Sequence, residues 1–353
     1  MSDNTPRTNI EQLGEFGLID RITKSFSPRH PATVLGIGDD AAIIQSSEEQ
    51  LVITSDMLLE GIHFDLAYMP LEHLGYKAVA VNISDIAAMN AIPKQITVNL
   101  GLSNRFSVEA VETLYRGIGH ACENYKVDLI GGDTTSSASG LVISVTAVGA
   151  APGNLITRRS TVQESDIVCV TGDLGGAYLG LQILAREKQV YLDTPDQQPQ
   201  LDKYDYVVRR QLRPEARMDL VYELRDVGVV PTGMIDVSDG LASELFHLSK
   251  QSNVGFRIFE ENIPYDQQTY ETAVEFQLSP ITCALNGGED YELLFTISQA
   301  DYEKIKNQAD VHSIGYAQKK ESGLQLATKA GQLVDLQAQG WNHFNSGDKE
   351  SKT

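Results

Sequence analysis

The stretch that decides the fold and the chemistry is Asp236-Val237-Ser238-Asp239-Gly240-Leu241-Ala242. Two carboxylates and a hydroxyl fall within four residues, and an apolar series at helical spacing runs from Leu241 to Leu248. The pattern predicts a helix that begins at an acidic turn. Capping of that helix by Ser238 or Asp239 would be enough to explain an isolated motif of this kind.

The motif is not isolated, because acidic turns recur along the chain. The others are Gly38-Asp39-Asp40, Thr54-Ser55-Asp56, Asn82-Ile83-Ser84-Asp85 and Gly131-Gly132-Asp133-Thr134. Carboxylates and hydroxyls on separate turns are typical oxygen ligands of hard divalent cations. A phosphate substrate could approach so many carboxylates only with such ions between them. The sequence therefore indicates phosphate chemistry in which aspartates hold Mg²⁺ and do not act as general bases.

The bulk composition bounds the class of protein. A chain of 353 residues with 42% hydrophobic and 22% charged residues predicts two globular domains. The net charge of −20 disfavours nucleic acid as a partner. No segment has the apolar length of a membrane span and no leader is evident, so we expect a cytoplasmic protein without a membrane partner. Cys122, Cys169 and Cys283 are odd in number and far apart, which predicts neither disulfides nor a thiolate metal site.

Periodicity predicts a mixed α+β fold with two domains. In the first half we expect strands at 34–37, 41–44, 51–54, 96–102, 127–130 and 141–148, and helices at 15–22, 70–91 and 108–125. In the second half we expect strands at 167–170, 255–259 and 291–297, and helices at 177–186, 214–227, 240–250 and 299–308. Gly131-Gly132 would end the strand at 130, and 188–206 would be a surface excursion. The break at Pro152-Gly153 suggests domains at 1–150 and 151–345, with a frayed N-terminus and a disordered tail at 346–353.

Several familiar phosphate motifs are excluded. Gly36-Ile37-Gly38-Asp39-Asp40-Ala41 matches the dinucleotide fingerprint, but the residues that follow predict a strand where that motif needs a helix. No Gly-Lys-Ser or Gly-Lys-Thr occurs, and neither do the protein-kinase triplets His-Arg-Asp and Asp-Phe-Gly. The spacing around Asp236 does not supply the alternating oxygens of an EF-hand.

The acidic turns, taken with their neighbours, resemble a known family. The motifs are Gly36-Ile-Gly-Asp-Asp-Ala, Thr54-Ser-Asp56 with Gly61-Ile-His63-Phe, Lys77-Ala-Val-Ala-Val-Asn82-Ile-Ser-Asp85, Leu129-Ile-Gly-Gly-Asp133-Thr-Thr, Asp236-Val-Ser-Asp-Gly-Leu and Gly287-Gly-Glu289-Asp-Tyr-Glu-Leu. In this order, over residues 36–343, they are similar to those of thiamine-monophosphate kinases, which belong to the aminoimidazole-ribonucleotide (AIR) synthetase superfamily. The resemblance implies an AIR-synthase-like fold and Mg²⁺- and ATP-dependent phosphorylation of thiamine monophosphate to thiamine diphosphate. It also implies a homodimer with the ATP site between N-terminal domains.

The resemblance implies roles for individual residues. Metal ligands would be Asp40, Thr54, Ser55, Asp56, Asp85, Asp133, Asp236 and Asp239, with Asp39 behind them. ATP would contact Tyr125, Gly132, Asp133, Arg159 and Ser238, and either of Arg158 and Arg159 could be the arginine concerned. Thiamine monophosphate would contact His63, Glu289 and Trp341, and no catalytic general base is expected. Structural roles remain open for His63, Tyr125 and Trp341, and Glu289 could simply cap a turn.

Two alternatives stay open, one within the same superfamily and one from another class. One is a related ATP-dependent synthetase, although a selenophosphate-forming enzyme would need a reactive cysteine near the N-terminus and a hydrogenase-maturation relative a C-terminal one. The first cysteine here is Cys122 and the last is Cys283, so neither pattern fits. The other alternative is a divalent-cation-binding protein without catalytic activity.

Overall fold

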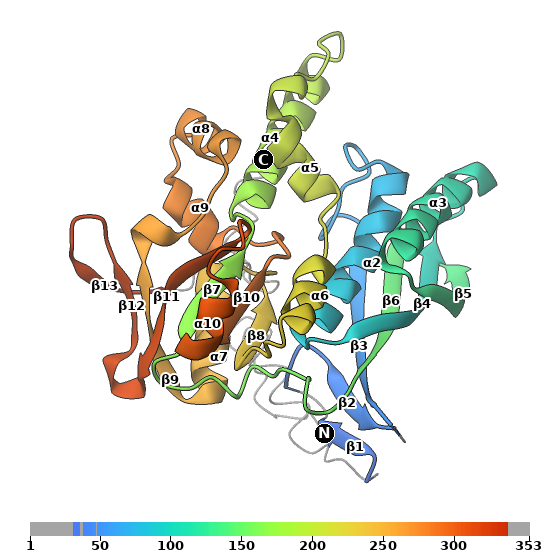
Figure 1. The fold of residues 1–353 in the computed structure, drawn as a ribbon. Coiled ribbons are helices and arrows are strands. Elements are labelled where there is room, and N and C mark those ends of the chain that lie inside the picture. Colours follow the sequence, from blue (N-terminus) through green and yellow to red (C-terminus); the bar gives the residue numbers. More distant parts are fainter. Residues whose placement is uncertain (1–30, 36–37, 47, 338–353) are drawn as a thin grey trace, which may run out of the picture.

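The computed structural model describes residues 31–35, 38–46 and 48–337 (Figure 1). Two β-sheets, each with its own helices, occupy the two halves of the molecule, and helix α2 runs between them (Figure 1). The predicted mixed α+β class is confirmed. The helix expected at 15–22, the frayed N-terminus and the tail at 346–353 lie outside the described residues.

The first sheet has the strand order β1-β2-β3-β6-β4-β5. Its strands are β1 Thr33–Leu35, β2 Ala42–Gln45, β3 Gln50–Leu59, β4 Ile92–Leu102, β5 Asp128–Ser136 and β6 Val142–Ala151. Neighbours pair antiparallel except β4 and β5, which are parallel. Helices α2 (Leu71–Ala88) and α3 (Val108–Tyr125) confirm the two helices expected here.

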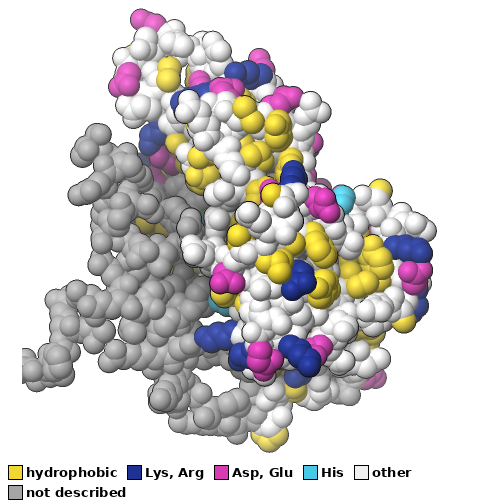
Figure 2. Space-filling view, turned by 90° about the vertical axis from the view of Figure 1, so that its left-hand side faces the viewer, with side chains coloured by type: hydrophobic (Ala, Val, Ile, Leu, Met, Phe, Trp, Pro, Cys, Tyr) yellow, Lys and Arg dark blue, Asp and Glu magenta, His cyan; other side chains and the backbone are white. Residues whose placement is uncertain are grey.

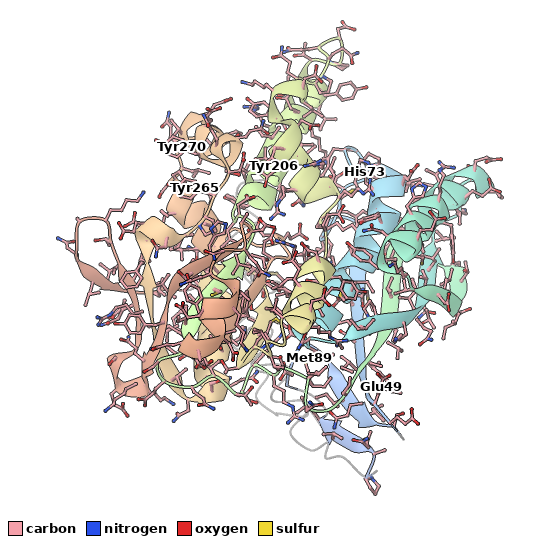
Figure 3. The ribbon with its side chains drawn as sticks, in the orientation of Figure 1. Glu49, His73, Met89, Tyr206, Tyr265 and Tyr270 are labelled. Carbon is pink, nitrogen blue, oxygen red and sulfur yellow. The ribbon has the colours of Figure 1, made fainter. Side chains whose placement is uncertain are left out.

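Two glycines allow α2 and α3 to pack closely. A Cβ on Gly75 would lie 2.0 Å from the carbonyl oxygen of Leu114 on α3. A Cβ on Gly117 would lie 1.8 Å from the carbonyl oxygen of Glu72 on α2. Each helix therefore has a glycine where the backbone of the other approaches, and any side chain there would push them apart. His73 and Met89, labelled in Figure 3, mark the two ends of α2.

Strand β5 differs from the prediction. The expectation that Gly131-Gly132 would end it is wrong, because β5 continues to Ser136. A Cβ on Gly132 would lie 1.8 Å from the carbonyl oxygen of Val98 on β4. The glycine therefore allows β4 to pair closely with β5, and β5 continues past it. Every residue of β5 is exposed.

The second sheet has the order β13-β12-β9-β11-β7-β10-β8. Its strands are β7 Ile167–Thr171, β8 Gly233–Asp236, β9 Val254–Phe259, β10 Leu293–Ile297, β11 Val311–Lys319, β12 Leu324–Ala327 and β13 Leu333–Asp335. The helices of this half are α4 Gly176–Asp193, α5 Asp205–Leu212, α6 Met218–Asp226, α7 Leu241–Ser252, α8 Gln267–Glu275, α9 Pro280–Asn286 and α10 Gln299–Ile305. Neighbouring strands are antiparallel except β9 and β12, which are parallel.

Alternate residues of the second sheet enter two different cores. Met234 and Phe295 belong to a large cluster that also contains residues of the first sheet, α2 and α3. Ile235 and Leu294, which are adjacent to these two residues in the sequence, belong to a second cluster with α7. Since successive strand side chains point to opposite faces, one face of this sheet packs towards the first half of the chain. The division between residues 150 and 151 stays a prediction.

The segment 188–206 is more regular than expected. Helix α4 continues to Asp193, and the 3₁₀ turn η2 (Asp202–Tyr204) leads into α5. The hydroxyl of Tyr204, a residue only 2% exposed, donates a hydrogen bond to Glu275 on α8 at 2.6 Å. The polar composition concealed this tertiary contact. Elements β8, α8, α9, β11, β12 and β13 were also not predicted, since they are short or lack clear periodicity.

The surface of the second half mixes polar and apolar groups. On the face in Figure 2, hydrophobic side chains form several patches with acidic and basic side chains around them. Tyr270 lies on α8 and Tyr265 just before it (Figure 3), and their stacked ring centroids are 6.2 Å apart. None of the helices in the described part of the chain has the length and apolar character that crossing a membrane requires.

Candidate active site

Three of the predicted metal ligands lie together. Asp40, Asp85 and Asp236 each offer a carboxylate oxygen, and these oxygens are all within 4.8 Å of one another. They come from the turn before β2, from α2 and from the last residue of β8. The side chains therefore meet where the two halves of the molecule join.

Hydroxyl groups support these carboxylates. Thr54 Oγ1 on β3 donates to Asp85 Oδ2 at 2.5 Å, and Ser84 Oγ on α2 donates to Asp236 Oδ2 at 2.7 Å. The backbone N–H of Asp56 donates to Asn82 Oδ1 at 3.1 Å. The Ser84–Asp236 hydrogen bond joins a helix of the first half to a strand of the second.

The cluster holds more negative charge than its surroundings neutralise. Burial, with the charge of Asp40 adding, raises the pKa of Asp236 to about 8, that of Asp39 to about 7 and that of Asp56 to about 6. Burial also raises the pKa of Asp85 well above its usual range, and the charges of Asp56 and Asp236 add to the effect. The raised pKa values reflect a shortage of positive charge around these carboxyl groups, which a bound cation would supply.

One cation of the protein itself reaches the cluster. Arg159 Nε and Nη2 donate to the two oxygens of Asp40 at 2.6 and 2.5 Å, and its backbone N–H donates to Asp39 Oδ2 at 3.2 Å. Of the two arginines that the sequence left open, Arg159 is the one in contact with these carboxylates. A role for Arg159 in binding ATP stays a prediction.

The loop after β8 brings in a carboxylate that sequence reasoning missed. Glu244, only 3% exposed, accepts a hydrogen bond from the backbone N–H of Asp239 at 3.0 Å and one from Ser238 Oγ at 3.5 Å. Burial raises its pKa well above the usual range, and the charge of Asp239 adds to the effect. An acidic residue in the first turn of α7, able to reach back to the preceding loop, was the available signal.

A second loop is docked on the first. The backbone N–H of Glu289 donates to Ser238 O at 2.7 Å, and that of Tyr291 donates to Val237 O at 2.9 Å. Glu289 and Tyr291 have φ values of 59° and 53°, which are rare for non-glycine residues and concentrate at functional sites. Gly288, with φ 73°, lets the loops approach, since a Cβ there would lie 2.6 Å from Ser238 O.

The predicted acceptor residues are only partly described. The Glu289 carboxylate accepts hydrogen bonds from Lys77 and Gln211. His63 follows β3, and its Nδ1 accepts a hydrogen bond from the backbone N–H of Leu59 at 3.0 Å, which leaves the proton of a neutral ring on Nε2. Trp341 lies outside the described residues.

Other predicted residues lie apart from the cluster. The side chain of Ser55 contacts Val145 O and Thr146 Oγ1, on the opposite face of β3 from Thr54. Gly132 and Asp133 lie on β5, which β6 and β4 separate from β3. Their predicted roles are not tested by this arrangement.

Tyr125 lies at the end of α3 in a buried polar group. Its hydroxyl accepts a hydrogen bond from the backbone N–H of Ala216 at 2.8 Å and contacts Glu215 Oε2 at 3.2 Å and the hydroxyl of Tyr76 at 3.3 Å. The hydroxyl thus joins α3 to the loop before α6. The predicted contact with ATP stays a prediction.

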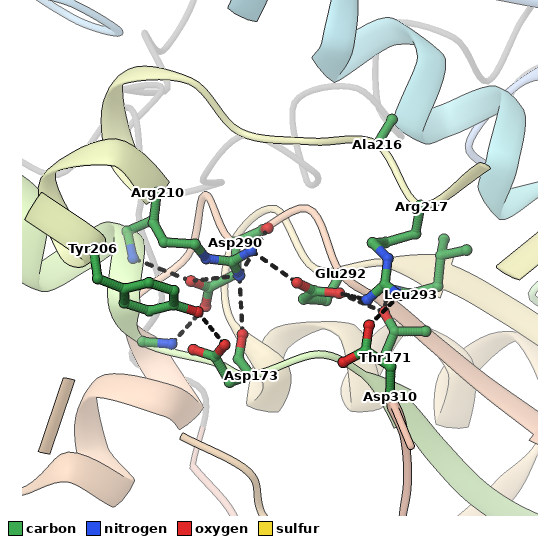
Figure 4. A network of polar contacts seen from close by, with 12 residues as sticks. Thr171, Asp173, Tyr206, Arg210, Ala216, Arg217, Asp290, Glu292, Leu293 and Asp310 are labelled. Carbon is green, nitrogen blue, oxygen red and sulfur yellow. Dashed lines mark hydrogen bonds and ion pairs between the residues drawn. The ribbon is translucent and has the colours of Figure 1, made fainter. Parts of the chain in front are cut away.

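A second buried network of charges lies in the other half (Figure 4). Glu292 accepts from Arg210 Nη1 at 2.8 Å, from Arg217 Nη1 at 2.6 Å and from Thr171 Oγ1 at 2.6 Å. Asp290 accepts from the backbone N–H groups of Gly175 and Ala177 at the start of α4, at 2.7 and 3.2 Å. The glycine-rich turn before α4 is therefore closed by a carboxylate of the protein itself.

Comparison with known sequences identifies the family. Residues 38–151 match the model of the AIR synthase related protein, N-terminal domain. Over 339 residues the chain is 36% identical to thiamine-monophosphate kinase of Bacillus subtilis, covering 94% of this chain and 100% of the relative. The chain belongs to the thiamine-monophosphate kinase family. The thiamine-monophosphate kinase of Aquifex aeolicus is 34% identical, covering 95% of this chain and 99% of that relative.

Solved structures agree with this assignment. The structure of AaThiL complexed with AMPPCP and TMP has a TM-score of 0.82 and 32% identity, covering 97% of this chain and 100% of that chain. Thiamine-monophosphate kinase from Stenotrophomonas maltophilia has a TM-score of 0.71 and 33% identity, covering 91% of this chain and 98% of that chain. The hydrogenase maturation protein HypE, 17% identical with a TM-score of 0.66, shares the fold alone, covering 94% of this chain and 98% of that chain. The predicted AIR-synthase-like fold of the thiamine-monophosphate kinase family is confirmed.

Proposed function

We propose that the chain is an ATP-dependent phosphotransferase that converts thiamine monophosphate and ATP into thiamine diphosphate and ADP, a step of thiamine diphosphate biosynthesis. The observation that carries the proposal is the meeting of Asp40, Asp85 and Asp236 in a member of the thiamine-monophosphate kinase family. The relative AaThiL, solved with AMPPCP and TMP, supports both substrates.

Mg²⁺ fits the donors in this cluster. They are carboxylate oxygens, which hard divalent ions prefer, and their raised pKa values reflect a shortage of positive charge. Asp40, Asp85 and Asp236 would hold the ions, and Thr54, Ser55, Asp56, Asp133 and Asp239 are the further ligands proposed from the family resemblance. When bound, Mg²⁺ would neutralise the phosphates and favour attack at the γ-phosphorus.

The transfer needs no general base from the protein. An oxygen of the acceptor phosphate, already ionised near neutral pH, forms the new bond to the γ-phosphorus as the bond to ADP breaks. The work of the chain is then to align two phosphates. Arg159 would exchange its contact with Asp40 for one with the nucleotide, and Ser238, Gly132 and Tyr125 are further proposed ATP contacts. His63, Glu289 and Trp341 would hold the acceptor.

We also propose a homodimer in the cytoplasm. The exposed strand β5 carries Leu129 and Ile130, which are 42% and 64% exposed, as an edge that a second copy could cover. Gly132 and Asp133 lie on this strand, so a dimer would place predicted ATP and metal ligands at the interface. Cys122 and the other two cysteines are free thiols, as is usual where ATP is made and used.

The dimer can be tested by mixing inactive subunits. Asp133→Asn and Asp236→Asn chains would each be inactive alone, and mixed dimers would regain activity if one site needs residues of both copies. Sedimentation measures the oligomeric state in parallel. A monomer in sedimentation, or no recovery in dimers shown to have exchanged subunits, would contradict a shared site.

The activity itself is tested by incubating the full chain with ATP, Mg²⁺ and a panel of phosphomonoesters. We expect thiamine diphosphate and ADP in equal amounts, preference for thiamine monophosphate, and no reaction in EDTA. Labelled ATP alone should leave no phosphoprotein, because transfer is direct. Preference for another acceptor would indicate a related enzyme, and cation binding without ADP formation would indicate a non-catalytic binder.

A further inference from the structure

Glu289 is held by two residues from different helices. Lys77 Nζ on α2 donates to Glu289 Oε2 at 2.9 Å, and Gln211 Nε2 on α5 donates to the same oxygen at 2.7 Å. The two donors are also joined, since Lys77 Nζ donates to the backbone oxygen of Gln211 at 3.3 Å. Lys77 is fully buried and Gln211 is 3% exposed, whereas the Glu289 side chain is 27% exposed. Oε2 of the Glu289 carboxylate is thus held by two donors, whereas part of the side chain is open to solvent.

The side-chain amide of Gln211 points its Nε2 at Glu289. Its Oε1 is buried without a hydrogen-bond partner among the described residues. Buried polar atoms without partners are uncommon in folded proteins and call for an explanation. Turning the amide over would set Oε1 against the carboxylate, and two acceptors repel. The orientation of Gln211 is therefore imposed by Glu289.

Helix α2 connects this pair to the carboxylate cluster. Lys77 lies eight residues before Asp85 on α2, which places the two about 12 Å apart along the helix axis and about 80° apart around it. That separation is comparable with the length of an acceptor with a phosphate at one end and an aminopyrimidine at the other. One rigid element thus carries a group for each end of the acceptor.

We propose that Lys77 and Gln211 are positioning residues for acceptor recognition. They hold Oε2 of Glu289, so that Oε1, which no donor in the described chain reaches, accepts a hydrogen bond from the amino group of the acceptor's pyrimidine. The positive charge of Lys77 balances the carboxylate at its buried end. This inference rests on the proposed function.

The test compares Michaelis constants for the two substrates. Glu289→Gln and Lys77→Met should each raise the KM for thiamine monophosphate about tenfold, as loss of an orienting partner does elsewhere, and leave the KM for ATP within about twofold. The double variant should be no worse than Glu289→Gln alone, because Lys77 acts through Glu289. Gln211→Leu should give a smaller effect of the same kind, and it replaces Lys77→Met if that variant does not fold.

Lys188→Met is the matched control. Lys188 on α4 also pairs with a carboxylate of the first half, Asp65, at 2.5 Å, but does not contact Glu289. It should leave both KM values unchanged. A normal acceptor KM in Lys77→Met, an equal rise for both substrates, or additive effects in the double variant would overturn the inference. An unchanged acceptor KM in Glu289→Gln would also overturn it, whereas a wild-type chain inactive on thiamine monophosphate would refute the proposed function itself.

Discussion

Among the described residues, two buried groups of carboxylates differ in how many cations of the chain contact them. In the second network, Glu292 lies between Arg210 and Arg217, and each guanidinium is within 2.8 Å of it. In the first, Asp40, Asp85 and Asp236 meet with only Arg159 of the described cations in direct contact. Both groups are buried, so burial alone does not distinguish one from the other.

From this difference we infer which group serves function. A buried carboxylate that has its cations within the chain is part of the fold, whereas one that lacks them is arranged for a cation from solution. The experiments below change one group at a time and ask whether stability or activity responds.

Asp236→Asn should have the largest effect. The amide keeps the shape but lacks the charge that would hold Mg²⁺, so kcat at low Mg²⁺ should fall about a thousandfold. Thermal unfolding in EDTA should show equal or greater stability, because one of several repelling acidic groups is gone. A near-normal rate at low Mg²⁺ would show that this cluster is not a metal site.

Glu292→Gln should lower stability and leave activity nearly unchanged, the reverse of Asp236→Asn. It leaves two buried guanidinium groups without their shared carboxylate, which should lower the free energy of unfolding by about 3 kcal/mol. The activity per folded molecule should stay within about twofold of the parent, since we assign Glu292 to the fold and not to the reaction. Denaturant unfolding and rates at saturating substrates measure the two effects. A large fall in kcat with normal stability would reverse our assignment of the two groups.

A matched pair of hydroxyl deletions sharpens the contrast. Ser84→Ala removes the donor to Asp236, and Thr171→Val removes the donor to Glu292. Ser84→Ala should raise the Mg²⁺ concentration needed for half-maximal rate about tenfold, as loss of outer-shell partners does in metal sites. Thr171→Val should cost about 1 kcal/mol of stability and leave the Mg²⁺ requirement unchanged. If both changed the Mg²⁺ requirement equally, the distinction between the groups would fail.

The smallest effect expected is a dependence of stability on pH. Asp236 and Asp39 have pKa values of about 8 and 7 in the fold, against about 4 in an unfolded chain. The folded state therefore binds more protons between these limits, and in EDTA the free energy of unfolding should fall as pH rises from about 4 to 8. Asp290, with a pKa of about 7, acts in the same direction. Saturating Mg²⁺ should restore the part of this stability that Asp236 and Asp39 account for. Thermal melting curves that Mg²⁺ does not change at any pH would contradict this.

The parts of the site that the sequence predicts are those carried by local motifs. The acidic turns identified Asp40, Asp85 and Asp236 because short polar residues beside apolar runs mark the ends of elements. Ser55 was named as a ligand from the family resemblance. Alternation along β3 turns its side chain to the face opposite that of Thr54, and its role as a ligand stays a prediction. The end assigned to β5 was wrong because a glycine that usually breaks a strand here fits against Val98.

Long-range partners could not be predicted. Lys77 is one of several polar residues in α2, and its partner Glu289 is 212 residues away in the sequence. Arg217 likewise gives no local sign that it will meet Glu292. Such pairs depend on how two sheets dock on α2, which no single motif determines.

The paired glycines of α2 and α3 limit how this enzyme can vary over evolutionary time. Gly75 lies two residues before Lys77, so any larger residue at Gly75 or Gly117 would shift α2 as a whole. Lys77 and Asp85 would then move together, and the two ends of the site are inherited as one unit. Lineages that take a longer or shorter acceptor should therefore differ first at Glu289, which meets α2 through the side chain of Lys77.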